Sequence, residues 1–190
     1  LGHSLYKGAL FMVAGILDHE TGTKDVAEMG GLRRLMPVTA VVAGVAALSL
    51  AGIPPLFGFL AKELMFEAVL EAPAFETLLF LLSIGAGICV MVVAAVIAIK
   101  PFFGTFRETP KHPHEAPVSM LAGPAVLAAL SLVFGVMLFI PESLLIEPVV
   151  AAVSGESASV SLSLWHGINA PLLMSAFSLV AAVAIFSQWG

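Results

Sequence analysis

Residues 37–70 read PVTAVVAGVAALSLAGIPPLFGFLAKELMFEAVL, an apolar stretch that Gly52, Pro54 and Pro55 interrupt. An unbroken helix of this length would run about 50 Å, well over the roughly 30 Å of a bilayer's hydrocarbon core. The two prolines remove backbone donors and clash with the preceding turn. We therefore predict one helix that stops near Ala51 and restarts after Pro55. Irregular backbone survives inside a membrane where it is buried in protein or lines a wet cavity, and broken helices mark ion sites in transporters.

The composition agrees with a membrane location for this stretch. Of the 190 residues, 59% are hydrophobic and 11% are charged, and the mean hydropathy is +1.05. Soluble domains carry about 25% charged residues, so this chain has too few charged side chains to form the surface of a soluble domain. The net charge of −5 also argues against a nucleic-acid partner, because no basic stripe is present to meet phosphates. A polytopic membrane protein in a lipid bilayer is the class that remains.

Four further apolar segments complete the predicted spans. They cover residues 1–17, 77–99, 117–140 and 170–189. Each is too long and too uniformly apolar for a barrel strand, which leaves helices as the way to satisfy the backbone in lipid. We predict an all-α polytopic membrane protein with about five transmembrane helices, one of them broken at Gly52–Pro55. Because a spanning helix needs about 20 residues, we expect the first helix to begin upstream of residue 1.

The Lys and Arg residues alternate between the predicted loops. Loops 18–36 and 100–116 carry six of the eight, whereas loop 71–76 and the outer surface loop 141–169 carry none. The positive-inside rule therefore places the two basic loops in the cytoplasm and the other two outside. Apolar residues between Leu144 and Val150 predict a short helix on the outer membrane surface, and Trp165 with His166 predicts an interfacial anchor.

The two remaining basic residues lie inside predicted spans. Lys7 falls near the middle of the first span, and His3, four residues earlier, shares its helix face. Ionisable residues at such depth are costly and usually serve ion or proton transfer. The alternative is a structural lysine paired with an acid on another helix.

The second lysine inside a predicted span follows the break in the long segment. Lys62 comes one turn after Gly58, and the alternative to an ion-path role is a lysine whose head reaches the outer interface. Glu63, Glu67 and Glu71 then follow at a spacing of four residues. We predict His3, Lys7 and Lys62 as proton-transfer residues, with Glu63 and Glu67 as a candidate outer exit; for Glu67 a solvated helix end is an equal alternative.

The sequence gives no sign of a resident cofactor. It contains no phosphate-binding loop, dinucleotide fingerprint or nucleophile elbow, and its single cysteine, Cys89, excludes a cysteine metal site within the chain. We predict no cofactor, no metal centre and no catalytic residue, with protons and sodium as transported ions.

Three motifs resemble one family of membrane subunits. His3–Phe11 (HSLYKGALF) is similar to the H-x-x-F-K-A-x-L-F helix of the antiporter-like subunits shared by Mrp antiporters and respiratory complex I. Residues 29–32 (MGGL) match the family's linker, and residues 50–62 (LAGIPPLFGFLAK) resemble its broken helix with a lysine. Within the family, residues 18–23 (DHETGT) are most similar to the large A subunits of Mrp-type sodium/proton antiporters. These motifs cover residues 1–70.

The resemblance implies a function and a setting. His3 and Lys7 would belong to the proton-transfer helix and Lys62 to the outer half of the path, with residues 1–190 forming part of an antiporter-like transmembrane domain. We predict a subunit of a multisubunit cation (sodium)/proton antiporter in a prokaryotic inner or plasma membrane, a secondary transporter and not an enzyme, whose partners are other membrane subunits. A proton-translocating subunit of an NADH:quinone oxidoreductase is the first alternative, and a structural membrane subunit without its own ion path is the second.

Overall fold

The computed structural model describes the chain except residues 73, 156–160, 165–166 and 189–190. The described residues form helices and loops with no strand. The elements in chain order are α1 (Gly2–Thr21), the 3₁₀ turns η1 (Val26–Glu28) and η2 (Leu32–Arg34), α2 (Pro37–Ala51), α3 (Phe57–Leu70), α4 (Glu76–Ile99), α5 (Val118–Val136), α6 (Phe139–Pro141), the π-helical turn η3 (Glu142–Ile146), α7 (Glu147–Ser154) and α8 (Ala170–Gln188).

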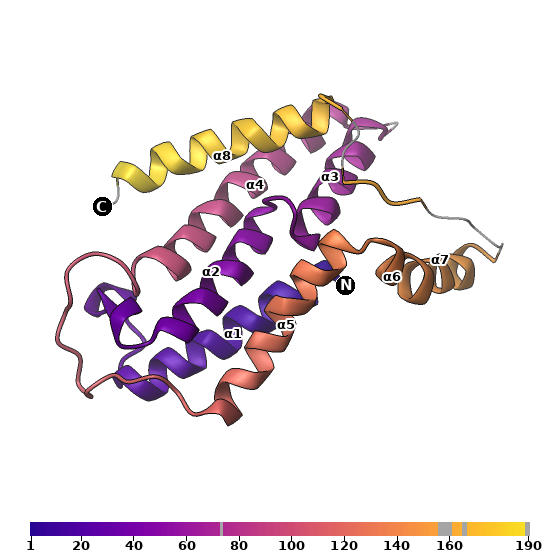
Figure 1. The fold of residues 1–190 in the computed structure, drawn as a ribbon. Coiled ribbons are helices and arrows are strands. Elements are labelled where there is room, and N and C mark those ends of the chain that lie inside the picture. The colour runs from indigo at the N-terminus through magenta and orange to yellow at the C-terminus, as the bar shows by residue number, and fades with distance from the viewer. Residues whose placement is uncertain (73, 156–160, 165–166, 189–190) are drawn as a thin grey trace.

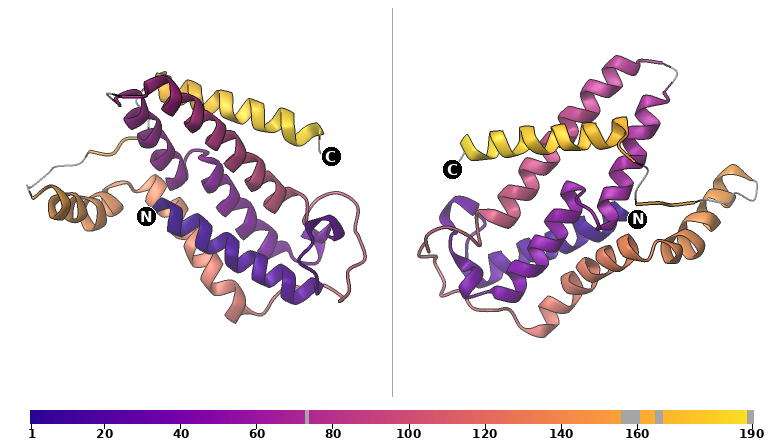
Figure 2. Two further views of the ribbon diagram at one scale, coloured as in Figure 1. Left: turned by 180° about the vertical axis from the view of Figure 1, so that it is seen from behind. Right: turned by 45° about the horizontal axis from the view of Figure 1, so that its top comes forward.

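The helices form a bundle with α2 inside it. Helix α2 packs on α1, α4 and α5, and α8 packs on the far side of α4. Figure 1 shows α3 continuing the course of α2 beyond the break, and the α6–α7 segment projecting away from the bundle. Figure 2 shows the same arrangement from two other sides. The interior is built from small and aliphatic residues, among them Ala43, Ala46 and Val13, which lets the helices approach closely.

The two predicted basic loops meet at one end of the bundle. The backbone N–H groups of Gly31, Leu32 and Arg33 donate to carbonyls of residues 101–103, at 3.1–3.2 Å. A Cβ on Gly30 would lie 2.6 Å from the Thr105 carbonyl oxygen, and Gly31 has φ of +69°. The MGGL motif is therefore the point at which the two loops cross, where a side chain would not fit.

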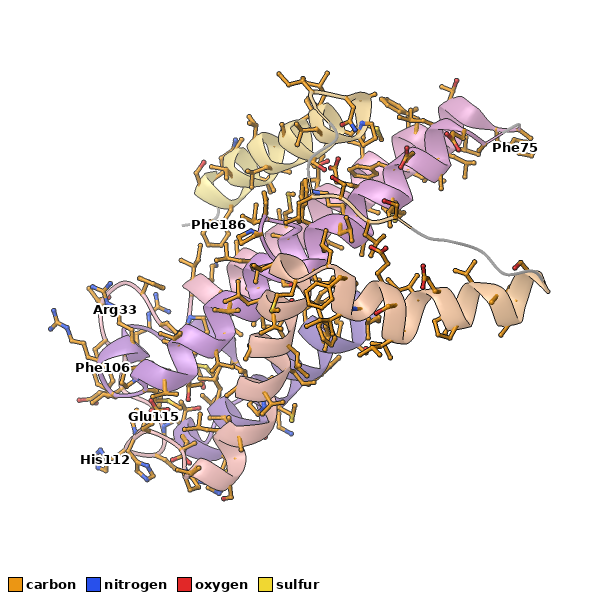
Figure 3. All side chains as sticks on the ribbon, turned by 45° about the vertical axis from the view of Figure 1, so that its right-hand side comes forward. Arg33, Phe75, Phe106, His112, Glu115 and Phe186 are labelled. Carbon is orange, nitrogen blue, oxygen red and sulfur yellow. The ribbon has the colours of Figure 1, made fainter. Side chains whose placement is uncertain are left out.

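The opposite ends of the molecule differ in chemistry. Figure 3 shows Arg33, Phe106, His112 and Glu115 gathered at the end where the basic loops meet, with Phe75 at the other end. The carboxylate of Glu115 caps the start of α2, accepting from the Val38 N–H at 2.6 Å and from the Thr39 hydroxyl at 2.5 Å. The loops with Lys and Arg and the loops without them were predicted to alternate along the chain, and they lie at the two ends of one bundle.

The first helix ends later than predicted. The sequence indicated an end at Leu17, where the apolar run stops, but α1 continues to Thr21. Polar residues can end an apolar run without ending the helix. The helix stops at Gly22, which has φ of +76° and whose backbone N–H donates to the Asp18 carbonyl. The predicted loop 18–36 therefore begins as a helical turn.

The fourth predicted span ends earlier than expected. Its apolar run continues to Ile140, yet α5 stops at Val136, and α6, η3 and α7 follow as a helical segment to Ser154. The first half of the predicted outer loop 141–169 is therefore helical, and the short helix expected near Leu144–Val150 lies within it. Residues 165–166, the predicted interfacial anchor, lie outside the described residues, as does residue 189 at the end of the fifth predicted span.

Much of the apolar surface faces outward. Among the described helices, three are long and apolar enough to cross a membrane: Thr77–Ile99, Val118–Val136 and Ala170–Gln188; α2 is a shorter apolar helix. In the first of these, 17% of the most apolar window is buried in the chain. Leu81, Val126 and Val180 are each more than half exposed. Such surfaces suit lipid and neighbouring helices and not water.

Candidate proton-transfer site

The break between α2 and α3 lies where the sequence predicted it. Helix α2 ends at Ala51, and Gly52 takes the left-handed conformation with φ of +70°. The Pro54–Pro55 peptide bond is cis. In an unbroken helix the carbonyls of Leu50 and Ala51 would accept from residues 54 and 55, and both are prolines without an N–H. The break therefore leaves these two carbonyls without their helical donors.

Lys62 supplies a donor to one of these carbonyls. Its ammonium Nζ lies 3.3 Å from the Ala51 carbonyl oxygen and 5.7 Å from the centroid of the Phe66 ring. A Cβ on Gly52 would lie 2.6 Å from Lys62 Cδ, so the lysine stem packs directly on that glycine. The ammonium thus sits at the C-terminal, negative end of α2, where a cation is favoured.

Helix α5 and the start of α3 hold the break in place. A Cβ on Gly58 would lie 1.8 Å from the Ser49 carbonyl oxygen, and one on Gly135 would lie 1.9 Å from the Pro55 carbonyl oxygen. The buried hydroxyls of Ser49 and Ser131 lie 2.6 Å apart, and the Gly58 N–H donates to the Ser49 hydroxyl at 3.3 Å. Close backbone contact and a hydroxyl pair therefore fix the irregular segment.

The two acids after Lys62 have different surroundings. Glu63 is half-buried and its Oε1 accepts from the Ser175 hydroxyl of α8 at 2.7 Å. A small cavity beside Glu63, about one water molecule in size, is lined by Phe59 and Asn169 among others. Glu67 is exposed. Of the predicted exit residues, Glu63 is built into the α3–α8 contact and Glu67 is not.

His3 and Lys7 lie on α1, whereas Lys62 lies on α3, and no hydrogen bond among the described residues joins them. The His3 ring packs edge-on against Tyr6 with centroids 5.4 Å apart, and the Tyr6 hydroxyl lies 3.4 Å from His3 Nδ1. Lys7 is half-buried and forms no hydrogen bond or ion pair with any described residue. Phe11, one turn further, is 73% exposed. His3 and Phe11 therefore leave part of the α1 surface exposed.

The residues that assemble the site were only partly visible in the sequence. Gly52, Pro54, Pro55, Gly58 and Lys62 stood out as a motif. Ser131 and Gly135 lie on α5, about 80 residues from Ser49 and Pro55, and Ser175 lies on α8. A small residue in an apolar helix is a weak signal, because many such residues only pack.

Helices α1 to α4, which include the break, match one family of known membrane proteins. A family model described as the transmembrane region of NADH:quinone oxidoreductase and Mrp antiporters matches residues 1–106. The chain belongs to this family. The predicted resemblance is confirmed, and it extends beyond residues 1–70, where the motifs lie.

The similar proteins are components of sodium/proton antiporters. The chain is 37% identical to the A subunit of the Na(+)/H(+) antiporter of Alkalihalophilus pseudofirmus over 98% of its length, and 37% identical to that of Bacillus subtilis over 93%. In a solved structure of the Mrp complex from a Dietzia species, a chain with 34% identity superposes with a TM-score of 0.78 over 98% of this chain and 20% of that chain. The chain spans about a quarter of the length of the curated relatives it matches.

These findings make the chain part of a multi-pass membrane protein whose relatives are subunits of multisubunit complexes. The relatives' names support a transporter and not an enzyme, while the family description includes redox-driven oxidoreductases.

Proposed function

We propose that this chain forms part of a subunit of a cation (sodium)/proton antiporter and carries a segment of its ion path. The observation that carries the proposal is the Lys62 ammonium resting 3.3 Å from the Ala51 carbonyl that the Pro54–Pro55 step leaves without a helical donor. This break occurs in a chain that is 37% identical to the A subunit of a Na(+)/H(+) antiporter.

The geometry suggests how one site serves two cations. A protonated Lys62 occupies the negative end of α2 and donates to Ala51. When the lysine releases its proton, the positive charge beside the Ala51 carbonyl is lost. The carbonyls of Leu50 and Ala51 can then serve as oxygen ligands of the kind that unwound helices offer to sodium. A proton on Lys62 and a metal cation at these carbonyls exclude one another by repulsion at short range, which is the condition for exchange.

The rest of the path follows from the other predicted residues. We propose that His3 and Lys7 pass protons along the exposed face of α1 toward the α1–α3 contact, where Gly2 packs on Ala61. The curated relatives are about four times as long as this chain, and we propose that their additional segments cover this face. We assign Glu63 to the outer exit and the basic loops to the cytoplasmic side of a prokaryotic plasma membrane, with other membrane subunits as partners and without a resident cofactor.

A flux measurement separates the antiporter from the redox-driven alternative. The full complex is reconstituted in liposomes with a pH-sensitive dye inside, and sodium is added without NADH or quinone. An antiporter moves protons in response to the sodium gradient alone. A redox-driven pump moves protons only when NADH and quinone are supplied and copurifies with subunits that hold iron–sulfur clusters; that result would replace the present proposal.

The two acids of α3 give a paired test of the exit. We expect Glu63→Gln to slow sodium-driven proton movement several-fold, because Glu63 is held against Ser175 and lies beside Lys62 in sequence. We expect Glu67→Gln to leave the rate within twofold, because Glu67 is exposed. The comparison is made in everted vesicles at equal complex content, and equal effects of the two substitutions would remove Glu63 from the path.

A further inference from the structure

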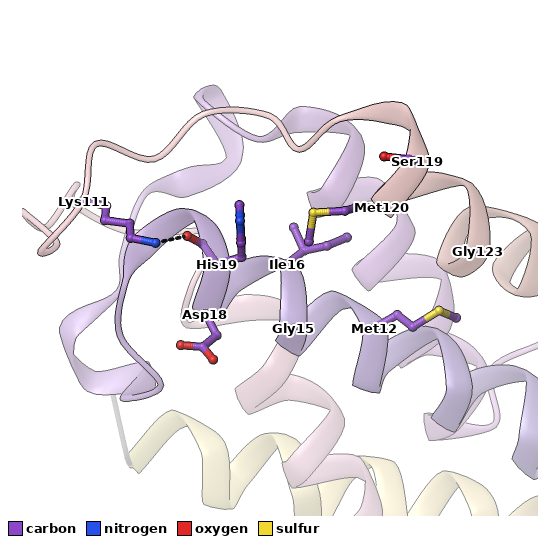
Figure 4. A pocket seen from close by; sticks show the side chains of 9 residues that line it. All are labelled: Met12, Gly15, Ile16, Asp18, His19, Lys111, Ser119, Met120 and Gly123. Atoms are coloured by element: carbon purple, nitrogen blue, oxygen red, sulfur yellow. Dashed lines mark hydrogen bonds between the residues drawn. The ribbon is translucent and has the colours of Figure 1, made fainter.

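A notch opens between α1 and α5 at the end of the bundle where the basic loops meet. Its volume is about 700 Å³, and its walls include Met12, Gly15, Ile16, Met120 and Gly123. A Cβ on Gly15 would find no atom within 4 Å, so the space beside it is open. Figure 4 shows Lys111 and His19 at one end of the notch and Met12 at the other.

The notch ends at Met12, part-way along the contact between α1 and α5. Met12 Sδ closes over Gly123, 2.9 Å from the position of a Cβ there. Beyond it, a Cβ on Gly8 would lie 2.8 Å from Leu127, so α1 and α5 are in direct contact. From Met12 to His19 the helix rises about 10 Å. One leaflet contributes half of the roughly 30 Å hydrocarbon core, so the notch is shorter than the thickness of one leaflet. A spanning helix from another protein would need a groove along the whole contact.

The mouth of the notch is polar and includes one lysine, Lys111, and one acid, Asp18. Lys111 Nζ donates to the His19 carbonyl at 2.9 Å, which uses one of its three protons. Asp18 also lies at the mouth, and Lys24 lies 3.6 Å from its carboxylate, so this acid has a counter-charge of its own. The apolar walls therefore end at a lysine in one of the basic loops, which the positive-inside rule places at the cytoplasmic surface of the membrane.

We propose that this notch binds a glycerophospholipid, with one acyl chain between α1 and α5 and its phosphate beside Lys111. The apolar walls and the open space at Gly15 receive part of the acyl chain, and the depth of about 10 Å lies within the thickness of one leaflet. The free protons of Lys111 donate to the phosphate oxygens, a charge-assisted contact. The site is separate from Lys62 and does not depend on the proposed transport function.

Photo-crosslinking in vesicles tests the site. The full complex is reconstituted in phosphatidylethanolamine and phosphatidylglycerol with a trace of phosphatidylethanolamine that carries a diazirine in its acyl chain. After illumination, labelled peptides are mapped by mass spectrometry. We expect labelling of residues 12–16 and 119–123 above that of the exposed face of α4, and we expect Gly15→Leu to reduce it at least fivefold by filling the notch.

Matched variants separate the notch from the surrounding lipid. Gly85→Leu introduces the same side chain at an exposed helical glycine with open space, and should leave labelling of the notch unchanged. Lys111→Gln should reduce it several-fold, whereas Arg34→Gln, a charge loss in the facing basic loop, should not. If the notch were labelled no more than α4 and Gly15→Leu did not change its labelling, the contact would be general lipid contact only. If Met12 cross-linked to another protein chain, the occupant would be a protein. Either result overturns the proposal.

Discussion

Replacing Lys62 with methionine should lower sodium-driven proton exchange by the full complex at least tenfold. Methionine keeps an apolar stem that can pack on Gly52 but removes the ammonium that donates to Ala51. Without a titratable group at the break, no proton can be exchanged for a cation at the freed carbonyls. The measurement is the proton response to a sodium pulse in everted vesicles, normalised to the amount of assembled complex.

Controls decide whether a loss of flux reflects the ion path. Lys24→Met removes a lysine that lies in a loop and pairs with Asp18 at 3.6 Å, and it should retain most of the activity. Lys7→Ala and His3→Ala should reduce flux while the complex still assembles. If Lys62→Met left exchange intact, the ion-path proposal would be wrong. If Lys62→Met, Lys7→Ala and His3→Ala changed assembly but not the flux per assembled complex, the chain would have a structural role only.

The second large effect is expected at Gly58. A Cβ there would lie 1.8 Å from the Ser49 carbonyl oxygen, so Gly58→Ala must push α3 away from the end of α2. Overpacking of this kind costs about 3 kcal/mol. We expect a several-fold loss of assembled complex and a clear drop in its thermal unfolding temperature, measured by size-exclusion fluorescence after heating. Gly135→Ala, whose Cβ would meet the Pro55 carbonyl oxygen at 1.9 Å, should act in the same direction.

A helical glycine in open space provides the contrast for this prediction. A Cβ on Gly85 would meet no atom within 4 Å, so Gly85→Ala adds helix propensity without a clash. Alanine is favoured over glycine in a helix by about 0.5–1 kcal/mol, so this variant should be as stable as the parent or slightly more. If Gly58→Ala were equally stable, the close packing of the break described above would be incorrect.

The family motifs and the break were readable from the sequence because they depend on local covalent chemistry. Two prolines that lack N–H groups stop α2 wherever the bundle places it, and Gly52 supplies the positive φ that ends it. The scarcity of charge set the membrane class, and the distribution of Lys and Arg set the alternation of the loops. These signals need no knowledge of which helices touch.

Helix ends without such local signals were predicted less well. The end of α1 was placed at Leu17 because polar residues begin there, yet the helix continues to Thr21 and stops at Gly22, whose positive φ ends it. Helix α5 ends at Val136, and the residue that follows is neither proline nor glycine. This end lies next to Gly135, where α5 contacts the break. The length of an apolar run follows the thickness of the membrane, so it indicates the ends of a helix only indirectly.

The sequence by itself determined that this chain crosses a membrane, that its second apolar segment is broken, and that Lys62 follows the break. Only the tertiary structure decided which group the lysine contacts, because its contact with Ala51 depends on how the start of α3 packs beside the end of α2. The partners of the break, Ser131 and Gly135, come from a helix about 80 residues away, and the Ser175 contact of Glu63 comes from another. Such contacts are set by packing between distant segments, which no local pattern of residues encodes.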